Sequence, residues 1–195
     1  MKIKSYYAST ELLCEKFDVY INRLPENLKE RILKMTDINA KVCSLGGALL
    51  LKIASKEFGT DPEMVVYAEN GKPYIPDSDF HFSISHTKGY AAISFGKVPS
   101  GCDIQIEKAV NLKISERFFS EKEKLTVADN LMEFFNVWCR KESLYKLSGT
   151  NCCTVDNKEK YVFKDFILKD DLHFCVCAET GEVLKPQLID FDTAF

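Results

Sequence analysis

A short stretch near the middle of the chain carries side chains suited to holding a metal ion. Residues 101–107 read GCDIQIE, and as a β-strand they would direct Asp103, Gln105 and Glu107 to one face and the apolar residues to the other. Two residues along a strand span about 6.6 Å, so Asp103 and Gln105 could converge on one ion, whereas Glu107 lies too far away. Asp103 would anchor such a site. Taken alone, an exposed polar strand face is the simpler interpretation.

A second candidate is the segment FFNVWCRKESLYKLSG, which predicts a helix that ends at Gly149. Trp138, Glu142 and Lys146 follow one another at four-residue steps and therefore share a face of that helix. A carboxylate and an ammonium group on one face suit a phosphate or metal site. By itself, a Glu142–Lys146 pair is more often a surface salt bridge, and a tryptophan such as Trp138 is more often part of a core.

A third candidate comprises NGKPYIP and the following FHFSISHTKGY. Lys72 lies in a turn and His86 lies close to the end of an expected strand, so both could face a ligand. A lone histidine is more often a structural residue, and Gly-Lys-Pro is a common turn.

The elements that must position these residues form a mixed pattern of helices and strands. Apolar residues at three- and four-residue spacing predict helices, and short alternating runs between turn residues predict strands. The expected helices cover residues 10–24, 25–58, 114–119, 121–128 and 131–147. The expected strands cover residues 1–8, 64–68, 80–85, 90–95, 102–107, 161–168, 172–178 and 187–191. Residues 98–101, with a proline and a glycine, are the best candidate boundary between two halves.

Composition bounds the class of protein. With 195 residues and 46% hydrophobic content the chain can bury a sizeable core, and its net charge of −3 disfavours a protein whose main role is to bind nucleic acid backbone. The eight cysteines lack CxxC spacing, which favours a reduced, cytoplasmic protein and disfavours structural zinc. The N-terminal residues lack a long apolar segment, and we expect neither secretion nor a membrane span.

Together, GKP, FSISHT, GCDIQIE, RFFSEKE and WCRKESLYKLSG resemble, in order and spacing, the Sfp-type 4'-phosphopantetheinyl transferases. The resemblance runs from about Asn70 to Gly149. It implies an α+β fold of two similar α/β halves that form an intramolecular pseudo-dimer, here residues 1–98 and 99–195, with coenzyme A in the cleft between them. It also implies a monomer, and the charge and apolar pattern described above lead us to expect no nucleic acid or membrane partner.

The resemblance assigns roles to individual residues. Mg²⁺ would be held by Asp103 and Glu142, and Lys146 and His86 would offset charge on the pyrophosphate of coenzyme A. Lys72 and Pro73 would lie near the adenine, and Ser85 would contact the same cofactor.

The sequence departs from the family pattern at two positions. Gln105 replaces the second acidic residue of the metal motif, so it is at best a neutral ligand, and we expect weaker metal affinity. Cys43 replaces a basic residue that relatives often carry before the Ser/Thr of the second helix. Ser44 and Lys41 are then left to meet the 3'-phosphate.

The implied reaction transfers 4'-phosphopantetheine from coenzyme A to a serine hydroxyl of an apo acyl or peptidyl carrier protein and releases 3',5'-ADP. The base is either Glu142 or a hydroxide bound to the metal. Residues 114–130, which include Phe118 and Phe119, correspond to the part of the family that meets the carrier. One of these two phenylalanines is expected to fill the core instead.

Two other functions remain open from the residues alone. A non-catalytic coenzyme A or nucleotide-binding regulator would keep Lys72 and His86 but would need no metal carboxylates; Gln105 is slightly in its favour. A metal-dependent phosphohydrolase would usually assemble more carboxylates and histidines than this chain offers.

Overall fold

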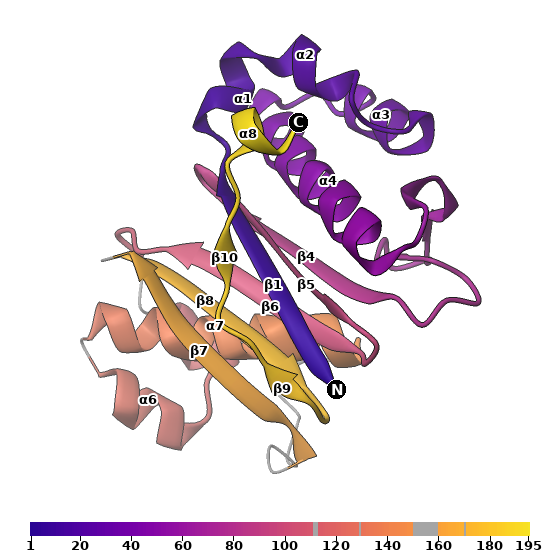
Figure 1. Cartoon of the computed structure of the whole chain (residues 1–195). Helices are drawn as coiled ribbons and strands as arrows, with labels where there is room; N and C mark the ends of the chain where they lie inside the picture. The colour runs from indigo at the N-terminus through magenta and orange to yellow at the C-terminus, as the bar shows by residue number, and fades with distance from the viewer. Residues whose placement is uncertain (111–112, 129, 150–159, 170) are drawn as a thin grey trace.

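The computed structural model describes residues 1–110, 113–128, 130–149, 160–169 and 171–195, and these residues form a mixed α+β fold (Figure 1). The strands are β1 (Lys2–Ser9), β2 (Val66–Tyr67), β3 (Pro73–Tyr74), β4 (His81–Thr87), β5 (Tyr90–Gly96), β6 (Ser100–Ile106), β7 (Val162–Lys169), β8 (Leu172–Ala178), β9 (Glu182–Val183) and β10 (Gln187–Leu188). The helices are α1 (Glu11–Glu15), α2 (Phe17–Ile21), α3 (Glu26–Leu33), α4 (Ile38–Phe58), the 3₁₀ turn η1 (Pro62–Met64), α5 (Ile114–Phe118), α6 (Glu121–Val127), α7 (Leu131–Ser148) and α8 (Phe191–Ala194).

The first sheet has the strand order β10-β1-β5-β4, and β9 also pairs with β1. The pairs β1–β5 and β4–β5 are antiparallel, and the turn between β4 and β5 contains Gly89 at a φ of 81°, as a tight turn requires. Helix α4 packs against this sheet, with α1, α2 and α3 around it (Figure 1). The apolar core on this side joins the inner faces of α4 and the sheet.

Capping residues set the two ends of helix α4. The Asp37 side chain accepts a hydrogen bond of 2.7 Å from the backbone N–H of Ala40, and Gly59 ends the helix in the left-handed conformation at a φ of 82°. By length and composition α4 could also cross a bilayer, but ten of its residues are buried in this structure, the position of a core helix.

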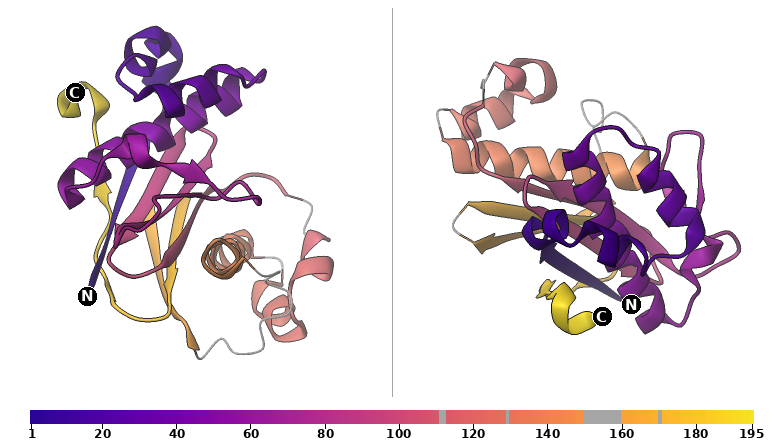
Figure 2. Two further views of the ribbon diagram at one scale, coloured as in Figure 1. Left: turned by 90° about the vertical axis from the view of Figure 1, so that its right-hand side faces the viewer. Right: turned by 90° about the horizontal axis from the view of Figure 1, so that it is seen from above.

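The second sheet has the order β6-β8-β7, and both pairs are antiparallel. Helix α7 packs on β6 and β8, and α6 lies against α7 (Figure 2). The Asn130 side chain caps the start of α7 by accepting from the Glu133 N–H at 3.1 Å, and Gly149 ends the helix at a φ of 70°, as expected from the sequence.

Close contact between α7 and β6 depends on Gly101. A Cβ at Gly101 would lie 1.9 Å from the Ser143 carbonyl oxygen and 2.7 Å from the Leu147 nitrogen. The backbone of α7 therefore rests directly on the backbone of β6, which brings the side chains of α7 to the polar face of that strand.

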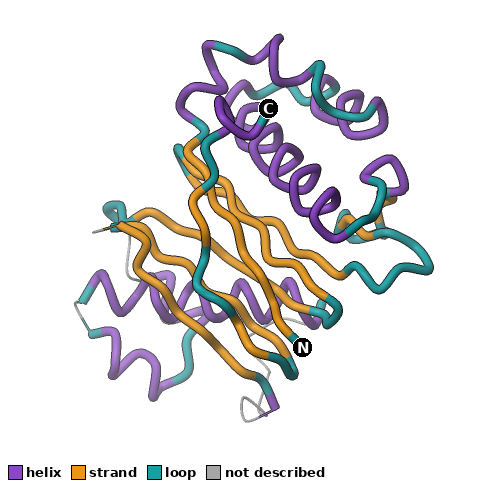
Figure 3. The backbone as a smooth tube through the Cα atoms, in the orientation of Figure 1, coloured by secondary structure: helices purple, strands orange, loops and turns teal. Residues whose placement is uncertain are grey.

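Side-chain hydroxyls of β4 join the two sheets. The backbone N–H groups of Cys102, Ile104 and Ile106 on β6 donate to Ser83 Oγ at 3.1 Å, Ser85 Oγ at 3.2 Å and Thr87 Oγ1 at 3.4 Å, respectively. These hydroxyls satisfy buried backbone donors that a neighbouring strand would otherwise satisfy. Apolar side chains of both sheets also pack together, among them Ile3 and Ala92 of the first and Ile104 and Phe174 of the second. The strands lie between α1–α4 on one side and the helices around α7 on the other (Figure 3).

The chain after β8 returns to the first sheet. β9 and β10 both run parallel to β1, and the following α8 packs its Phe191 into the first core (Figure 1). The expected strand over residues 187–191 is therefore wrong beyond Leu188, because Asp190 caps a helix there by accepting from the Asp192 N–H at 3.0 Å.

Several other expectations about elements need correction. The stretches 10–24 and 25–58 each contain two helices, and residues 64–68 contain only the end of η1 and the two-residue β2. The other expected strands and helices agree with the structure to within about two residues at each end, whereas β3 and β9 were not expected. Of the eight cysteines, Cys152 and Cys153 lie outside the described residues, and the other six are free thiols, as expected.

Candidate active site

Asp103 lies at the junction of the two sheets and is 2% exposed. Its Oδ1 accepts hydrogen bonds from Ser85 Oγ at 2.7 Å and from Lys146 Nζ at 2.8 Å, and its Oδ2 accepts from Gln105 Nε2 at 3.1 Å. The interpretation of this strand face as exposed is wrong, because α7 covers it. A buried carboxylate of this kind requires such partners to remain charged.

Lys146 reaches Asp103 from the last turn of α7. Its Nζ also donates to Ser85 Oγ at 2.7 Å. Burial lowers the pKa of the Lys146 ammonium, but Asp103, Cys102 and Glu142 together outweigh this effect, so that the net pKa lies above the usual value. The alternative interpretation of Glu142 and Lys146 as a surface salt bridge is wrong: within the described part of the chain the ammonium pairs with Asp103 instead.

Glu142 lies one helical turn before Lys146 and is partly buried. Burial raises the pKa of its carboxyl, and the charge of Asp103 raises it further, while Lys146 acts in the opposite direction. No hydrogen bond to this carboxylate comes from any residue that the structure describes. Among the described residues the Glu142 carboxylate thus has no hydrogen-bond donor, and the charge of Asp103 acts on it.

Two neighbouring carboxylates from different elements fit a Mg²⁺ ion, which usually takes one or two carboxylates and completes its shell with water and substrate phosphate oxygens. The described residues contain no group of three or more His, Cys, Asp or Glu side chains arranged around one point. Asp103 and Glu142 could therefore hold such an ion only together with oxygens from a ligand or water.

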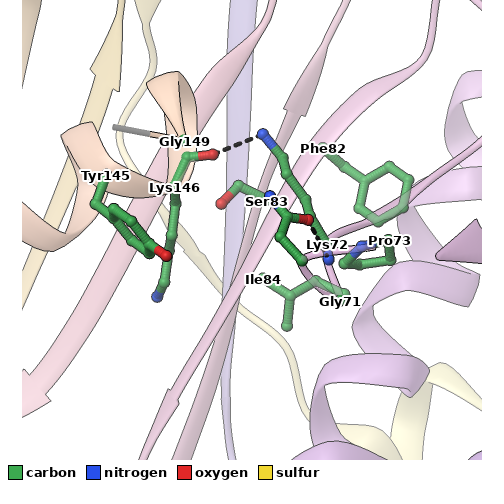
Figure 4. A pocket seen from close by; sticks show the side chains of 10 residues that line it. Gly71, Lys72, Pro73, Phe82, Ser83, Ile84, Tyr145, Lys146 and Gly149 are labelled. Carbon is green, nitrogen blue, oxygen red and sulfur yellow. Dashed lines mark hydrogen bonds between the residues drawn. The ribbon is translucent and has the colours of Figure 1, made fainter. Parts of the chain in front are cut away.

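A cavity of about 240 Å³ opens beside Lys146 (Figure 4). One side is formed by the 70–73 turn and β4, and the other by the end of α7, including Tyr145. Lys72 crosses it: its Nζ donates to the Lys146 carbonyl oxygen at 2.6 Å (Figure 4). Burial lowers the pKa of the Lys72 ammonium. The cavity thus lies between parts of the chain that are far apart in sequence.

Two further cavities continue from this one towards α3. The next, of about 280 Å³, shares Gly71, Pro73 and Ile84 with the first and is also lined by Ser44 and His86. The last, of about 490 Å³, shares Arg31, Met35 and Tyr67 with the second and adds Lys34. We call these three adjacent cavities, which share lining residues, the long groove; cationic side chains line both of its ends.

His86 lies on the wall of the long groove, at the end of β4. Its side chain keeps access to solvent, yet the protein atoms around it lower the pKa of the imidazole. The Lys146 charge lowers that pKa further, while Asp103 acts in the opposite direction. The neutral ring can therefore accept or donate a hydrogen bond at neutral pH.

Comparison with known proteins identifies the family. A model of the 4'-phosphopantetheinyl transferase superfamily matches residues 99–183, which contain Asp103, Glu142 and Lys146. The chain is 30% identical to the 4'-phosphopantetheinyl transferase Sfp of Bacillus subtilis (strain 168) over 158 residues, which cover 76% of this chain and 70% of that protein. This chain belongs to the 4'-phosphopantetheinyl transferase superfamily. The resemblance found in the sequence is thereby confirmed, and the chain is an enzyme of that family.

Two other relatives of this transferase carry the same description. The 4'-phosphopantetheinyl transferase psf-1 of Bacillus pumilus is 32% identical over 120 residues, or 57% of this chain and 52% of that protein. The 4'-phosphopantetheinyl transferase AcpT of Salmonella typhimurium is 28% identical over 160 residues, or 74% of this chain and 80% of that protein.

The remaining predicted site residues of the transferase lie at different distances from this centre. Gln105 lies next to Asp103, but it contacts that carboxylate through its amide nitrogen, which donates a hydrogen bond to Oδ2. Glu107, which the spacing placed too far from Asp103 to share an ion, follows the end of β6, and its Oε1 lies 2.7 Å from His173 Nε2. Lys41 lies one turn before Ser44 on α4 and lines none of the three cavities.

Sequence reasoning missed Arg31, whose guanidinium lies over the Tyr67 ring at 3.9 Å from its centroid and lines the long groove. The available signal was the spacing of Arg31 and Lys34, which are neighbours on the surface of a helix. Nothing local links α3 to the 70–73 turn, so this pair could not be assigned to the site from sequence.

An aromatic cluster supports the helix that carries Glu142. Trp138 stacks on Phe134 at 6.0 Å and meets Phe118 edge-on at 5.8 Å. Phe119 is buried whereas Phe118 is only partly buried, as expected for one member of the pair. Next to this cluster, Lys141 and Glu123 form an ion pair of 3.0 Å whose side chains are 8% and 14% exposed, and this pair ties α6 to α7.

Proposed function

We propose that this transferase moves 4'-phosphopantetheine from coenzyme A to a serine hydroxyl of an apo carrier protein, releases 3',5'-ADP and depends on Mg²⁺. The observation that carries the proposal is that Lys146, which lines one end of the long groove, binds Asp103, whose charge also acts on the Glu142 carboxyl. Family membership supports the transfer itself.

Coenzyme A is proposed to lie along the long groove. Its pyrophosphate would sit beside Lys146 and His86, and its adenine would sit near Lys72 and Pro73, which line the cavities next to them. The second cavity also contains Ser44 and Arg31. We propose that Arg31 supplies, with Ser44, the cation for the 3'-phosphate that Cys43 cannot supply, because guanidinium binds phosphate well. Lys41 remains a candidate for the same role.

Asp103 and Glu142 are proposed to hold Mg²⁺ together with phosphate oxygens of the ligand. The ion would polarise the phosphate and neutralise charge on it when bound. Gln105 supports this arrangement by donating to Asp103 Oδ2, which keeps the carboxylate oriented; its carbonyl oxygen is a candidate further ligand.

In the proposed reaction the carrier serine Oγ attacks the β-phosphorus in line. The bond between this phosphorus and the bridging oxygen breaks, and the bridging oxygen leaves with 3',5'-ADP. Lys146 and His86 stabilise the charge that accumulates on the leaving phosphate. The serine proton would pass to Glu142 if that carboxylate does not hold the ion, and otherwise to a hydroxide at the metal.

The carrier protein is proposed to dock on the region around α5 and α6. Apolar side chains there are exposed, with Leu125 83% and Ile114 36% accessible, and Phe118 lies partly buried beneath them. Acyl and peptidyl carrier proteins are both candidates. The buried Lys141–Glu123 pair would keep this surface at a constant position relative to Glu142.

The two halves of the chain are proposed to form an intramolecular pseudo-dimer. Each contains a strand, a long helix and a hairpin: β1, α4, β4 and β5 in residues 1–98, and β6, α7, β7 and β8 in residues 99–195. In both, the first strand pairs with the third and the third with the second. A chain with both halves needs no second copy to form the groove, so we propose a monomer that acts in the cytoplasm, without a membrane or nucleic acid partner.

Incubation with coenzyme A, Mg²⁺ and apo carrier proteins of both kinds, followed by intact-mass measurement, tests the proposal. We expect the carrier to gain one phosphopantetheine group. Asp103→Ala and Glu142→Ala should each abolish this gain while circular dichroism shows a folded protein. An unmodified carrier of every kind tested would overturn the proposed transfer, and full activity in both variants would overturn the proposed metal ligands.

A further inference from the structure

The Asp103 carboxylate accepts hydrogen bonds from three protein side chains, which leaves little room on it for a metal ion. Oδ1 accepts from Ser85 and Lys146, and Oδ2 accepts from Gln105. A carboxylate has about four lone-pair positions, so the protein itself fills three of them. One position on Oδ2 remains open, but a cation there would still lie within a few ångströms of the Lys146 ammonium, and coordination through Oδ1 requires a donor to leave.

Lys146 is the donor that can leave. Ser85 Oγ is held by the backbone N–H of Ile104, and Gln105 lies on the same strand as Asp103. The Lys146 ammonium, in contrast, is carried by a flexible four-carbon chain, and its side chain is 26% exposed and lines the first cavity. It has room to move into the space where the pyrophosphate is proposed to bind.

A divalent cation and the Lys146 ammonium cannot share this oxygen at low cost. Both would lie within a few ångströms of each other, and their repulsion is strong because water is largely excluded from Asp103. The two cations therefore compete for one carboxylate oxygen.

We infer that Lys146 holds the metal position on Asp103 until the pyrophosphate of coenzyme A draws the ammonium away, so that metal and coenzyme A bind in a coupled manner. This inference rests on the proposed function, since it takes the metal ligands from it. Without coenzyme A, the ammonium keeps a buried carboxylate paired and the metal affinity low. With coenzyme A, the lysine exchanges Asp103 for a phosphate oxygen and the carboxylate becomes available. The coupling is reciprocal, because linkage requires it.

The test is Mn²⁺ binding, measured by the loss of the electron paramagnetic resonance signal of free Mn²⁺ at mildly alkaline pH. Lys146→Met removes the competing charge with a side chain of similar length. We expect it to bind Mn²⁺ at least about tenfold more tightly than the unmodified protein in the absence of coenzyme A. Lys72→Met is the matched control, because it removes a lysine of the same cavity that contacts the Lys146 carbonyl and not Asp103. It should change the affinity by no more than about twofold.

The outcomes separate this inference from the proposed function. Equal Mn²⁺ affinity in the unmodified protein and Lys146→Met would overturn the inference and leave the proposed metal site intact. An equal gain in Lys72→Met would also overturn it, because the effect would then come from the total charge of the cavity. No Mn²⁺ binding by any form, even with coenzyme A, would overturn the metal site itself and this inference with it.

A second measurement needs no variant and so does not depend on whether Lys146→Met folds. Acetic anhydride labels lysines as free amines, and the labelled peptides are quantified by mass spectrometry. Saturating Mn²⁺ without coenzyme A should displace Lys146 from Asp103, which favours its protonated form, and increase its labelling several-fold relative to Lys72. Unchanged labelling of Lys146 while Mn²⁺ is bound would overturn the inference.

Discussion

Helices α4 and α7 both cover a three-stranded antiparallel arrangement, but they contact it differently. On α4 the glycines belong to the helix, and a Cβ at Gly46 or Gly47 would meet the side-chain atoms Thr10 Cγ2 at 2.6 Å or Ile84 Cγ2 at 2.8 Å. Under α7 the glycine belongs to the strand, and a Cβ at Gly101 would meet the helix backbone. Side chains can rotate away, whereas a helix backbone can only shift as a whole. The helix that carries Glu142 and Lys146 is therefore the more rigidly placed of the two.

The first region, around α4 and the first sheet, and the second region, around α7 and the second sheet, also differ in whether their buried polar groups are paired. In the first, the hydroxyls of Ser5 and Ser55 are buried without a hydrogen-bond partner among the described residues. In the second, Asp103, Lys141 and His173 are buried and all paired. Unpaired hydroxyls cost stability and have no evident role, while the paired groups hold the candidate active site in place. The comparison predicts that polar substitutions matter far more in the second region.

The largest expected effect comes from Asp103→Asn. We expect the transfer rate to fall roughly a thousandfold, because loss of several kcal/mol of transition-state stabilisation corresponds to that factor. The measurement is the rate of carrier modification at saturating Mg²⁺. Ser5→Ala, in the first strand of the other region, should leave the rate unchanged and raise the free energy of unfolding by up to about 1 kcal/mol. A comparable loss of rate in Ser5→Ala would contradict the comparison.

Gly101→Ala should have the next largest effect. Because the new methyl group would push α7 away from β6, we expect a loss of about 3 kcal/mol in the free energy of unfolding and a fall of about a hundredfold in rate. Urea unfolding and the transfer assay measure both. Gly46→Ala meets side chains only, so it should lose stability while keeping most of the rate per folded molecule; a hundredfold fall there would remove the distinction between the two helices.

Lys141→Met tests the contact between α6 and α7. The substitution removes the positive charge of a buried ion pair, so the Glu123 carboxylate loses this partner. We therefore expect a loss of about 3 kcal/mol in the free energy of unfolding. The matched change in the first region is Lys16→Met, which breaks the exposed Lys16–Asp192 pair and should have a much smaller effect in the same urea unfolding experiment. Equal losses would show that burial does not distinguish these pairs.

The smallest expected effect concerns Tyr20, whose hydroxyl donates to Asp192 in the first region. Burial, assisted by Asp192, raises the pKa of Tyr20 to about 12. The folded protein thus keeps the phenolic proton at pH values where the unfolded chain loses it, and stability falls as the pH rises from about 10 towards about 12. Tyr20→Phe should reduce this alkaline loss in urea unfolding. An identical pH profile in Tyr20→Phe would show that another group causes it.

Much of the site was predictable because the residues that carry it lie in short motifs. The four-residue step between Glu142 and Lys146 and the alternation around Asp103 correctly placed all three on the faces that meet. What the motifs missed was the pairing: Lys146 binds Asp103 and not Glu142, and Gln105 donates to Asp103. Such choices depend on distances between elements, which local spacing does not specify.

For the fold too, local patterns predicted the elements but not the contacts between distant parts of the chain. Strand and helix periods predicted most elements, yet the return of residues 182–195 to β1 and the break of residues 25–58 into α3 and α4 were not predictable. The burial of β6 on both faces was also missed, because an alternating strand leaves the cover of its polar face undetermined.

The sequence by itself determined the family, the types of side chain available for chemistry, and the elements that carry them, because these follow from local order and spacing. Only the tertiary structure decided that Ser85 would link Asp103, Lys146 and the backbone of β6, and that Arg31 would line the same groove as His86. The physical reason is that these contacts join residues from separate parts of the chain, and their geometry exists only once α7 has packed on Gly101 and the two sheets have met.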